Sequence, residues 1–343
     1  MGGSLNLWGS IGPGTFLVLL GGMSTGCFPL PMKFVKNWKW ENIWLLYSLV
    51  GLLALPWLVA FATVSDLLSV YRATSIYTLS LTMLFGLLWG VGNVLFGEAV
   101  AMVGVALTFA IVGGLAASIG SLIPLILLRP DRLMTPSGMI IILGVLMTVT
   151  GVAILGVAGR RREKRMSQKA ASGSVLLGIS LCVASGVFGA MLNFSFAFGA
   201  SIADEAVRRG TAPSNGSYAG WAIALLGGLV SNGGYAILKL VRNRTWGQFW
   251  QPGTGRAYCL SASMGILFCS GFLLYGKGAT MLGSLGSVVG WPVFQATTIL
   301  ISTATGAACG EWQGADRSFL YLNIAGIGIL VAAIVVVSLG SQF

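Results

Sequence analysis

Long apolar runs, separated by short polar or charged stretches, form the pattern along this 343-residue chain. The run 140–159, "IIILGVLMTVTGVAILGVAG", contains no charged residue and has the length of a helix that crosses a bilayer, about 20 residues. Strands of membrane barrels instead alternate apolar and polar positions. Because backbone polar groups in lipid must be satisfied within helices or closed barrels, the pattern predicts an all-α integral membrane protein.

The runs predict ten transmembrane helices. Their approximate ranges are 12–35, 42–63, 77–102, 104–128, 137–159, 173–199, 217–240, 257–281, 283–309 and 318–341. The stretch 160–172, "RRREKRMSQKAAS", predicts a basic cytoplasmic connector between a first half, 1–159, and a second half, 173–343.

The two halves carry an internal repeat. The segment 86–104, "GLLWGVGNVLFGEAVAMVG", aligns with 265–283, "GILFCSGFLLYGKGATMLG", so that four glycines, two aromatic residues and a methionine coincide. A weaker match aligns 25–34 with 185–194. Five helices in each half is an odd number, so the halves insert in opposite directions. This predicts two inverted five-helix repeats with a substrate site near the midplane between them, as in secondary transporters.

Composition narrows the function classes. The chain is 56% hydrophobic and only 8% charged, with no histidine, whereas soluble domains are about a quarter charged. Histidine acid–base chemistry and histidine metal sites are therefore excluded, and no C-x-x-C pair or phosphate-binding loop is present. We expect no cofactor. A membrane enzyme would lack the acid–base groups, metal ligands or activated nucleophile that it needs.

The net charge of +11 indicates an orientation in the membrane rather than nucleic-acid binding, because the basic residues lie in short loops between apolar runs. Fourteen lysines and arginines follow the first, fifth, seventh and ninth predicted helices, and five follow the second, fourth and sixth. Because loops rich in lysine and arginine stay cytoplasmic, both termini are predicted to be external.

Two pairs of an aromatic and an amide residue are candidates for substrate binding. Trp89 and Asn93, and likewise Trp291 and Gln295, are four residues apart and therefore share a helix face. An aromatic surface with amide groups suits a sugar, which has hydroxyls and an apolar face. Further amides at membrane depth are Asn193 and Asn232. The alternative is that the amides only join helices and the tryptophans are lipid-facing anchors.

Three charged residues are candidates for gating or coupling. Glu98 and Lys277 occupy equivalent positions of the repeat and fall near opposite membrane faces. We expect Glu98 to pair with Lys33 in a cytoplasmic gate, and Lys277 to pair with Asp204 or Glu205 on the external side. The alternative is that both charges extend to the membrane surface. The stretch "NWKWENIW", 37–44, is typical of an interfacial anchor.

Several motifs resemble the L-rhamnose–proton symporter family of the drug/metabolite transporter superfamily. They are "CFPLPMKFVKNWKWENIW" (27–44), "WGVGN" (89–93), "GVLMTVTGVAI" (144–154), "EKRM" (163–166) and "GEW" (310–312). The resemblance covers nearly the whole chain. It implies a ten-helix carrier of the cell inner membrane that takes up a deoxy sugar with protons. Ser287 and Phe294 stand about where the family has an acidic residue and a histidine.

The sequence therefore predicts a secondary transporter of a small polar metabolite, such as L-rhamnose or a related deoxy sugar, by proton symport. Its partners are the sugar, protons and the lipid bilayer, and no nucleic acid. The alternative is a drug/metabolite-type carrier or exporter of another solute without proton coupling.

The predicted orientation can be tested by thiol labelling. A single cysteine placed within 160–169 should not react with an impermeant thiol reagent added to intact cells, because the basic connector is cytoplasmic. Labelling of that cysteine from outside would reverse the orientation.

Overall fold

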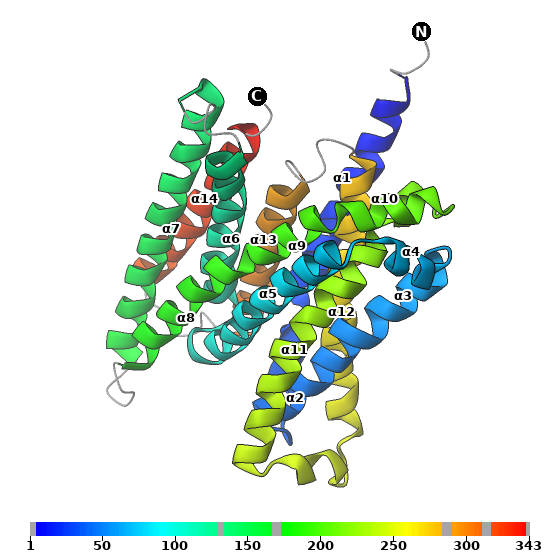
Figure 1. Cartoon of the computed structure of the whole chain (residues 1–343). Coiled ribbons are helices and arrows are strands. Elements are labelled where there is room, and N and C mark those ends of the chain that lie inside the picture. Colours follow the sequence, from blue (N-terminus) through cyan, green and yellow to red (C-terminus); the bar gives the residue numbers. More distant parts are fainter. Residues whose placement is uncertain (1–4, 129–133, 167–172, 283–289, 311–316, 341–343) are drawn as a thin grey trace.

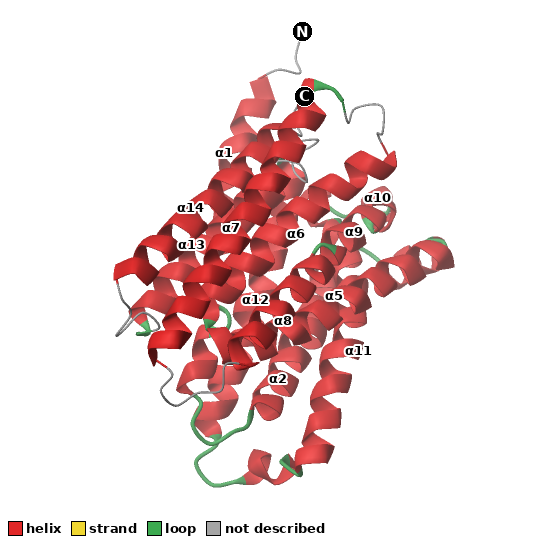
Figure 2. Ribbon diagram, turned by 90° about the vertical axis from the view of Figure 1, so that its left-hand side faces the viewer, coloured by secondary structure: helices red, strands yellow, loops and turns green. Residues whose placement is uncertain are grey.

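The computed structural model describes residues 5–128, 134–166, 173–282, 290–310 and 317–340. Within these ranges the regular structure is entirely helical (Figure 2). Eight helical segments are long and apolar enough to cross a membrane, and the two stretches Leu107–Gly120 and Val293–Ala308 are shorter apolar helices. The prediction of an all-α integral membrane protein is confirmed at this level.

The α-helices follow one another along the chain with short connections. They are α1 (Leu5–Cys27), α2 (Trp40–Ser48), α3 (Leu55–Thr63), α4 (Leu67–Ala73), α5 (Ile76–Val103), α6 (Val105–Leu128), α7 (Pro136–Met166), α8 (Gly173–Gly189), α9 (Met191–Phe198), α10 (Ala200–Arg208), α11 (Ser217–Asn243), α12 (Gly255–Met281), α13 (Trp291–Ala308) and α14 (Arg317–Gly340).

Some boundaries differ from the predicted ones. A π-helical segment, Leu49–Ala54, joins α2 to α3, so the second predicted span is one continuous helical segment. The sixth predicted span, 173–199, is divided into α8 and α9, and α10 follows it. Gly104 separates α5 from α6 at a φ of 90°, a conformation that favours glycine. Helix α7 continues to Met166, so 160–166 of the predicted connector are helical, and the rest of the connector lies outside the described residues.

Helices from the two halves of the chain interleave. Helix α5 packs along α11 and α8, α1 packs along α12 and α13, and α7 packs along α14. Helix α1 begins, and α14 ends, at one end of the molecule, whereas the connection from α11 to α12 lies at the opposite end (Figure 1). We call the latter the α11–α12 end.

Glycines permit the closest of these helix contacts. A Cβ atom on Gly86 of α5 would lie 1.9 Å from the carbonyl oxygen of Ala224, and one on Gly227 of α11 would lie 2.1 Å from that of Met83. Since apolar lipid gives helices little hydrophobic reason to associate, close backbone approach is what stabilises their packing. The glycines at these two positions thereby bring the polar residues of α5 next to those of α11.

Candidate functional site

A small cavity of about 70 Å³ lies at the centre of the molecule. Its walls come from α1, α5, α6, α8, α9, α12 and α13, so both halves of the chain contribute. Four of the predicted site residues line it together: Trp89, Asn93, Trp291 and Gln295. Other side chains in its wall include Thr25, Phe28, Phe96, Phe109, Ser185, Phe268, Phe272 and Thr298.

Aromatic rings form most of the cavity wall. The Trp89 ring stacks on Phe268 with 5.5 Å between ring centroids, and Phe28 meets Phe268 edge-on at 5.3 Å. Trp291 stacks on Phe294 at 5.6 Å at the start of α13. Such ring pairs add to the free energy of burial and fix ring orientation. The cavity therefore has firm apolar surfaces on which a flat, partly apolar molecule can lie.

A few polar atoms interrupt this aromatic wall. Asn93 Nδ2 donates to the Tyr47 hydroxyl at 3.0 Å and to Asn232 Oδ1 at 2.9 Å. Both amide hydrogens are thereby used, so the Asn93 oxygen can accept a bond from a ligand. Gln295 Nε2 donates a long bond, 3.4 Å, to the Gly113 carbonyl oxygen.

Two more polar groups in the wall are buried without a hydrogen-bond partner among the described residues: the Trp291 indole N–H and the Thr25 hydroxyl. Unpaired buried polar groups are unfavourable, and a ligand hydroxyl would satisfy them. Donors and acceptors spread around aromatic surfaces are the set that a monosaccharide requires.

Asn232, predicted to bind substrate, lies behind the cavity rather than in its wall. Its Oδ1 accepts from Asn93 Nδ2 and also from Trp44 Nε1 at 2.8 Å, and its Nδ2 donates to the Gly228 carbonyl oxygen at 2.8 Å. The residue is fully buried. Its contacts make Asn232 a positioning residue that holds the Asn93 amide in place.

Asn193 of α9 lies at the edge of the central cavity. Its Nδ2 and the Trp291 Nε1 atom are each 3.7 Å from the position that a Cβ on Gly120 would occupy. The side chain is partly buried and is not among those that line the cavity.

The ion partner of Glu98 differs from the predicted one. Glu98 Oε1 is 2.6 Å from Lys239 Nζ of α11, so the expected pair with Lys33 is not formed in this conformation. The reason is packing, because α5 lies along α11 whereas Lys33 follows α1 in the turn Leu30–Phe34. Lys239 Nζ also lies 4.7 Å from the centroid of the Trp40 ring, a cation–π contact.

The predicted external pair of Lys277 is not formed either. Glu205 instead binds Arg209 at 2.7 Å and also pairs with Arg208, one turn along α10. Lys277 of α12 is partly buried and makes no ion pair with a described residue. Ser287, which the resemblance singled out, lies outside the described residues, and Phe294 is buried against Trp291.

The stretch "NWKWENIW" joins the two halves instead of anchoring the chain in lipid. Trp44 and Trp38 are buried, and Trp38 Nε1 donates to the Gln248 carbonyl oxygen at 3.0 Å. Glu41 accepts from Asn243 Nδ2 and Thr245 Oγ1, both at 2.9 Å. The aromatic and basic composition suggested an anchor, and nothing local in it identifies these distant partners.

The α11–α12 end of the molecule is therefore closed by bonds between the halves. Proceeding from the central cavity, the layers are the Asn93–Asn232–Trp44 network, the Glu98–Lys239 pair, and the Glu41 bonds to the end of α11. Lys239 is seven residues from Asn232, or about 10 Å along the helix. In the described parts of the chain no three His, Cys, Asp or Glu side chains are grouped to hold a metal ion.

Replacing Asn232 tests its role in holding this network. We expect Asn232→Ala to lower the free energy of unfolding by about 2 kcal/mol, because the buried N–H groups of Trp44 and Asn93 lose their acceptor. Ser231→Ala, which removes one bond to the Leu87 carbonyl oxygen, is the control and should cost less than about 1 kcal/mol. The measurement is denaturation of the purified protein in detergent, and equal losses for the two variants would contradict the assignment.

The chain is similar to known proteins along nearly its whole length. The family described as L-rhamnose-proton symport protein matches residues 8–342. An L-rhamnose-proton symporter of Klebsiella pneumoniae subsp. pneumoniae is 28% identical over 334 residues, which cover 95% of this chain and 97% of the relative. Symporters of that name from Escherichia coli (strain 55989) and Shigella boydii serotype 18 are each 27% identical over the same shares. The chain therefore belongs to the L-rhamnose–proton symporter family and is a secondary transporter rather than an enzyme.

Proposed function

We propose that the protein carries L-rhamnose or a related deoxy sugar across the cell inner membrane together with protons. The observation that carries this proposal is the central cavity, where the amides of Asn93 and Gln295 and the indole N–H of Trp291 meet aromatic walls. The relatives' names supply the sugar and the proton.

Ten transmembrane helices in two inverted repeats are part of the proposal. The two short apolar helices, in α6 and α13, would complete the count of eight longer segments. Helix contacts support the repeat. If α1, α2, α5 and α6 correspond to α8, α11, α12 and α13, then the contacts α5–α8, α5–α11 and α6–α8 become α12–α1, α12–α2 and α13–α1, which are also observed.

Equivalent glycines of the repeat also have equivalent neighbours. A Cβ on Gly97 of α5 would lie 2.5 Å from the Trp44 ring, and one on Gly276 of α12 would lie 2.5 Å from the Trp221 ring. The two tryptophans belong to α2 and α11, which correspond in the repeat. The cavity between the halves then lies on the axis that relates them, where inverted-repeat transporters bind substrate.

The central cavity is too small for a sugar in this conformation. A volume of about 70 Å³ is roughly half that of a cavity of about 150 Å³ that holds one benzene molecule. Binding therefore requires the halves to move apart, and transport would follow from opening the two ends in turn. With the α11–α12 end on the cytoplasmic side and both termini external, this structure is closed toward the cytoplasm.

The Glu98–Lys239 pair is our candidate for coupling transport to protons. It joins α5 to α11 beyond the Asn93–Asn232 layer, and both side chains are only partly buried. Protonation of the Glu98 carboxyl would remove its charge and so weaken the pair with Lys239. The cytoplasmic closure would then depend on whether Glu98 holds a proton.

Uptake into liposomes tests the substrate and the site together. We expect the purified protein to accumulate L-rhamnose when a proton gradient is imposed. Gln295→Ala should raise the KM about threefold to tenfold, because a ligand hydrogen bond is lost. Gln251→Ala, at an exposed position after α11, is the control. Uptake that is saturable but indifferent to the proton gradient would favour the uncoupled carrier, and no uptake of any sugar in a panel would refute the proposal.

The coupling role of Glu98 has its own test. We expect Glu98→Gln to lose uptake driven by the proton gradient while keeping exchange of labelled for unlabelled sugar, because the neutral amide can no longer release a proton. Glu205→Gln changes a carboxylate whose partners are Arg208 and Arg209, and should behave as wild type. Identical dependence of uptake on pH for Glu98→Gln and wild type would exclude the role.

A further inference from the structure

A second and larger cavity, which we call the vestibule, lies between α9, α10, α11 and α12. Its volume is about 630 Å³, within the range of about 300–1,000 Å³ that small-molecule sites occupy. It lies at the beginning of α11 and the end of α12, opposite the closed α11–α12 end (Figure 1). Most of the wall is apolar, with methyl groups from alanines 200, 203, 224 and 279.

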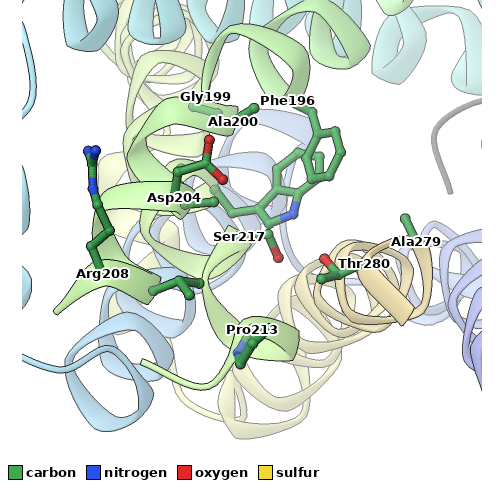
Figure 3. A pocket seen from close by; sticks show the side chains of 14 residues that line it. Phe196, Gly199, Ala200, Asp204, Arg208, Pro213, Ser217, Ala279 and Thr280 are labelled. Atoms are coloured by element: carbon green, nitrogen blue, oxygen red, sulfur yellow. The ribbon is translucent and has the colours of Figure 1, made fainter. Parts of the chain in front are cut away.

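Two buried polar groups in the vestibule wall have no hydrogen-bond partner within the described parts of the chain. They are the indole N–H of Trp221 and the hydroxyl of Ser217, on residues that are 1% and 6% exposed. Figure 3 shows the Ser217 hydroxyl directed toward Thr280 across the space, with Asp204 on the α10 wall. Both atoms lie against Gly276 of α12, where a Cβ would be 2.5 Å from Trp221 Nε1 and 3.1 Å from Ser217 Oγ, so a ligand reaches them once α11 and α12 shift slightly apart. Since buried donors are normally paired, a ligand or water that entered there would pair with them.

The repeat makes the unpaired Trp221 informative. Its counterpart Trp44, at the closed end, donates its indole N–H to Asn232. At the vestibule end no described amide takes that place, and the Trp221 N–H lies beside a cavity instead. The two corresponding tryptophans therefore differ in their surroundings. Trp44 joins helices at the closed end, and Trp221 lies next to the vestibule.

The chemistry of the wall selects a neutral, hydroxylated ligand. Trp221 and Phe196 stack at 5.3 Å between centroids and give an aromatic surface. Asp204 can accept from two hydroxyls, and the Thr280 hydroxyl, which donates to the Gly276 carbonyl oxygen, can accept from one more. The cation in the described wall, Arg208, pairs with Glu205, and Asp204 adds a negative charge, so the wall does not favour an anionic ligand.

We propose that the vestibule is an outer sugar-binding subsite, in which a monosaccharide packs on Phe196 and the edge of Trp221 and bonds to Asp204, Ser217 and Trp221 Nε1. This inference rests on the proposed function and adds a second site to it. The ring of Phe272 contacts Trp221 at 5.5 Å and lines the central cavity, so a single layer of aromatic side chains separates the two sites. Sugar held in the vestibule would be ready to enter the central cavity when that layer moves.

Protection of an engineered thiol detects binding in the vestibule directly. Val207 lines the vestibule and is exposed, so a Val207→Cys variant should react with a maleimide reagent, above the labelling of the same protein without the substitution. We expect L-rhamnose to slow this reaction in the purified protein. Asp204→Asn or Ser217→Ala, added to it, should raise the half-protecting concentration about tenfold, because a ligand hydrogen bond is lost.

The controls separate the vestibule from the central site. Asp66→Asn makes the same chemical change at an exposed position near the α10–α11 turn, outside the vestibule, and should leave protection unchanged. Protection should also persist when Asn93 and Gln295 are both replaced by alanine. If protection is instead lost when Asn93 and Gln295 are replaced, and is unchanged by Asp204→Asn and Ser217→Ala, the sugar binds in the central cavity. The vestibule inference is then wrong, while the transport proposal stands. Protection by L-rhamnose without its uptake into liposomes would support the vestibule and count against the proposed function. No protection by any sugar would overturn the vestibule.

Discussion

The arrangement of this protein depends on one buried amide oxygen. Asn232 Oδ1 accepts hydrogen bonds from Trp44 Nε1 and Asn93 Nδ2, and so joins α2, α5 and α11 at a single point. Without water to take its place, an acceptor at this depth keeps its donors together. The bond orients the Asn93 amide toward the central cavity and holds the Trp44 ring against Gly97. The hydrogen bonds to Asn232 Oδ1 therefore both help to close one end of the molecule and position the candidate site.

In the proposed repeat, the two ends of the molecule use corresponding residues differently. Around Trp44 the halves meet through amides, an ion pair and the Glu41 bonds. Around Trp221 the corresponding space is a cavity of about 630 Å³. If the halves are the inverted repeats proposed above, each half has the surfaces for both arrangements, and the carrier can exchange them. The charges differ between the ends, since Glu98 has a cationic partner and Lys277 has no ion partner among the described residues. Under the proposed coupling, a proton would therefore act mainly at one end.

Much of the architecture follows from local sequence patterns. Apolar runs of about 20 residues dictate helices in a membrane because the backbone must satisfy itself. The spacing of four between Trp89 and Asn93, and between Trp291 and Gln295, places each pair on one helix face whatever the neighbours are. Those four side chains line one cavity, as the spacing and the repeat together indicated. Gly104 likewise separates α5 from α6, since its φ of 90° favours glycine.

The sequence by itself thus determined the helices, their faces and the class of protein, all of which depend on residues close together in the chain. Only the tertiary structure decided the partners. Glu98 pairs with Lys239 instead of Lys33 because Gly86 and Gly227 let α5 lie directly along α11. Asn232 holds Asn93 instead of lining the cavity, and Trp38 and Trp44 turn into the protein instead of lipid. The hydropathy of a side chain indicates whether it will be buried or exposed. Its hydrogen-bond or ion-pair partner depends on which helix lies beside it. The neighbouring helix is set by packing between segments more than a hundred residues apart.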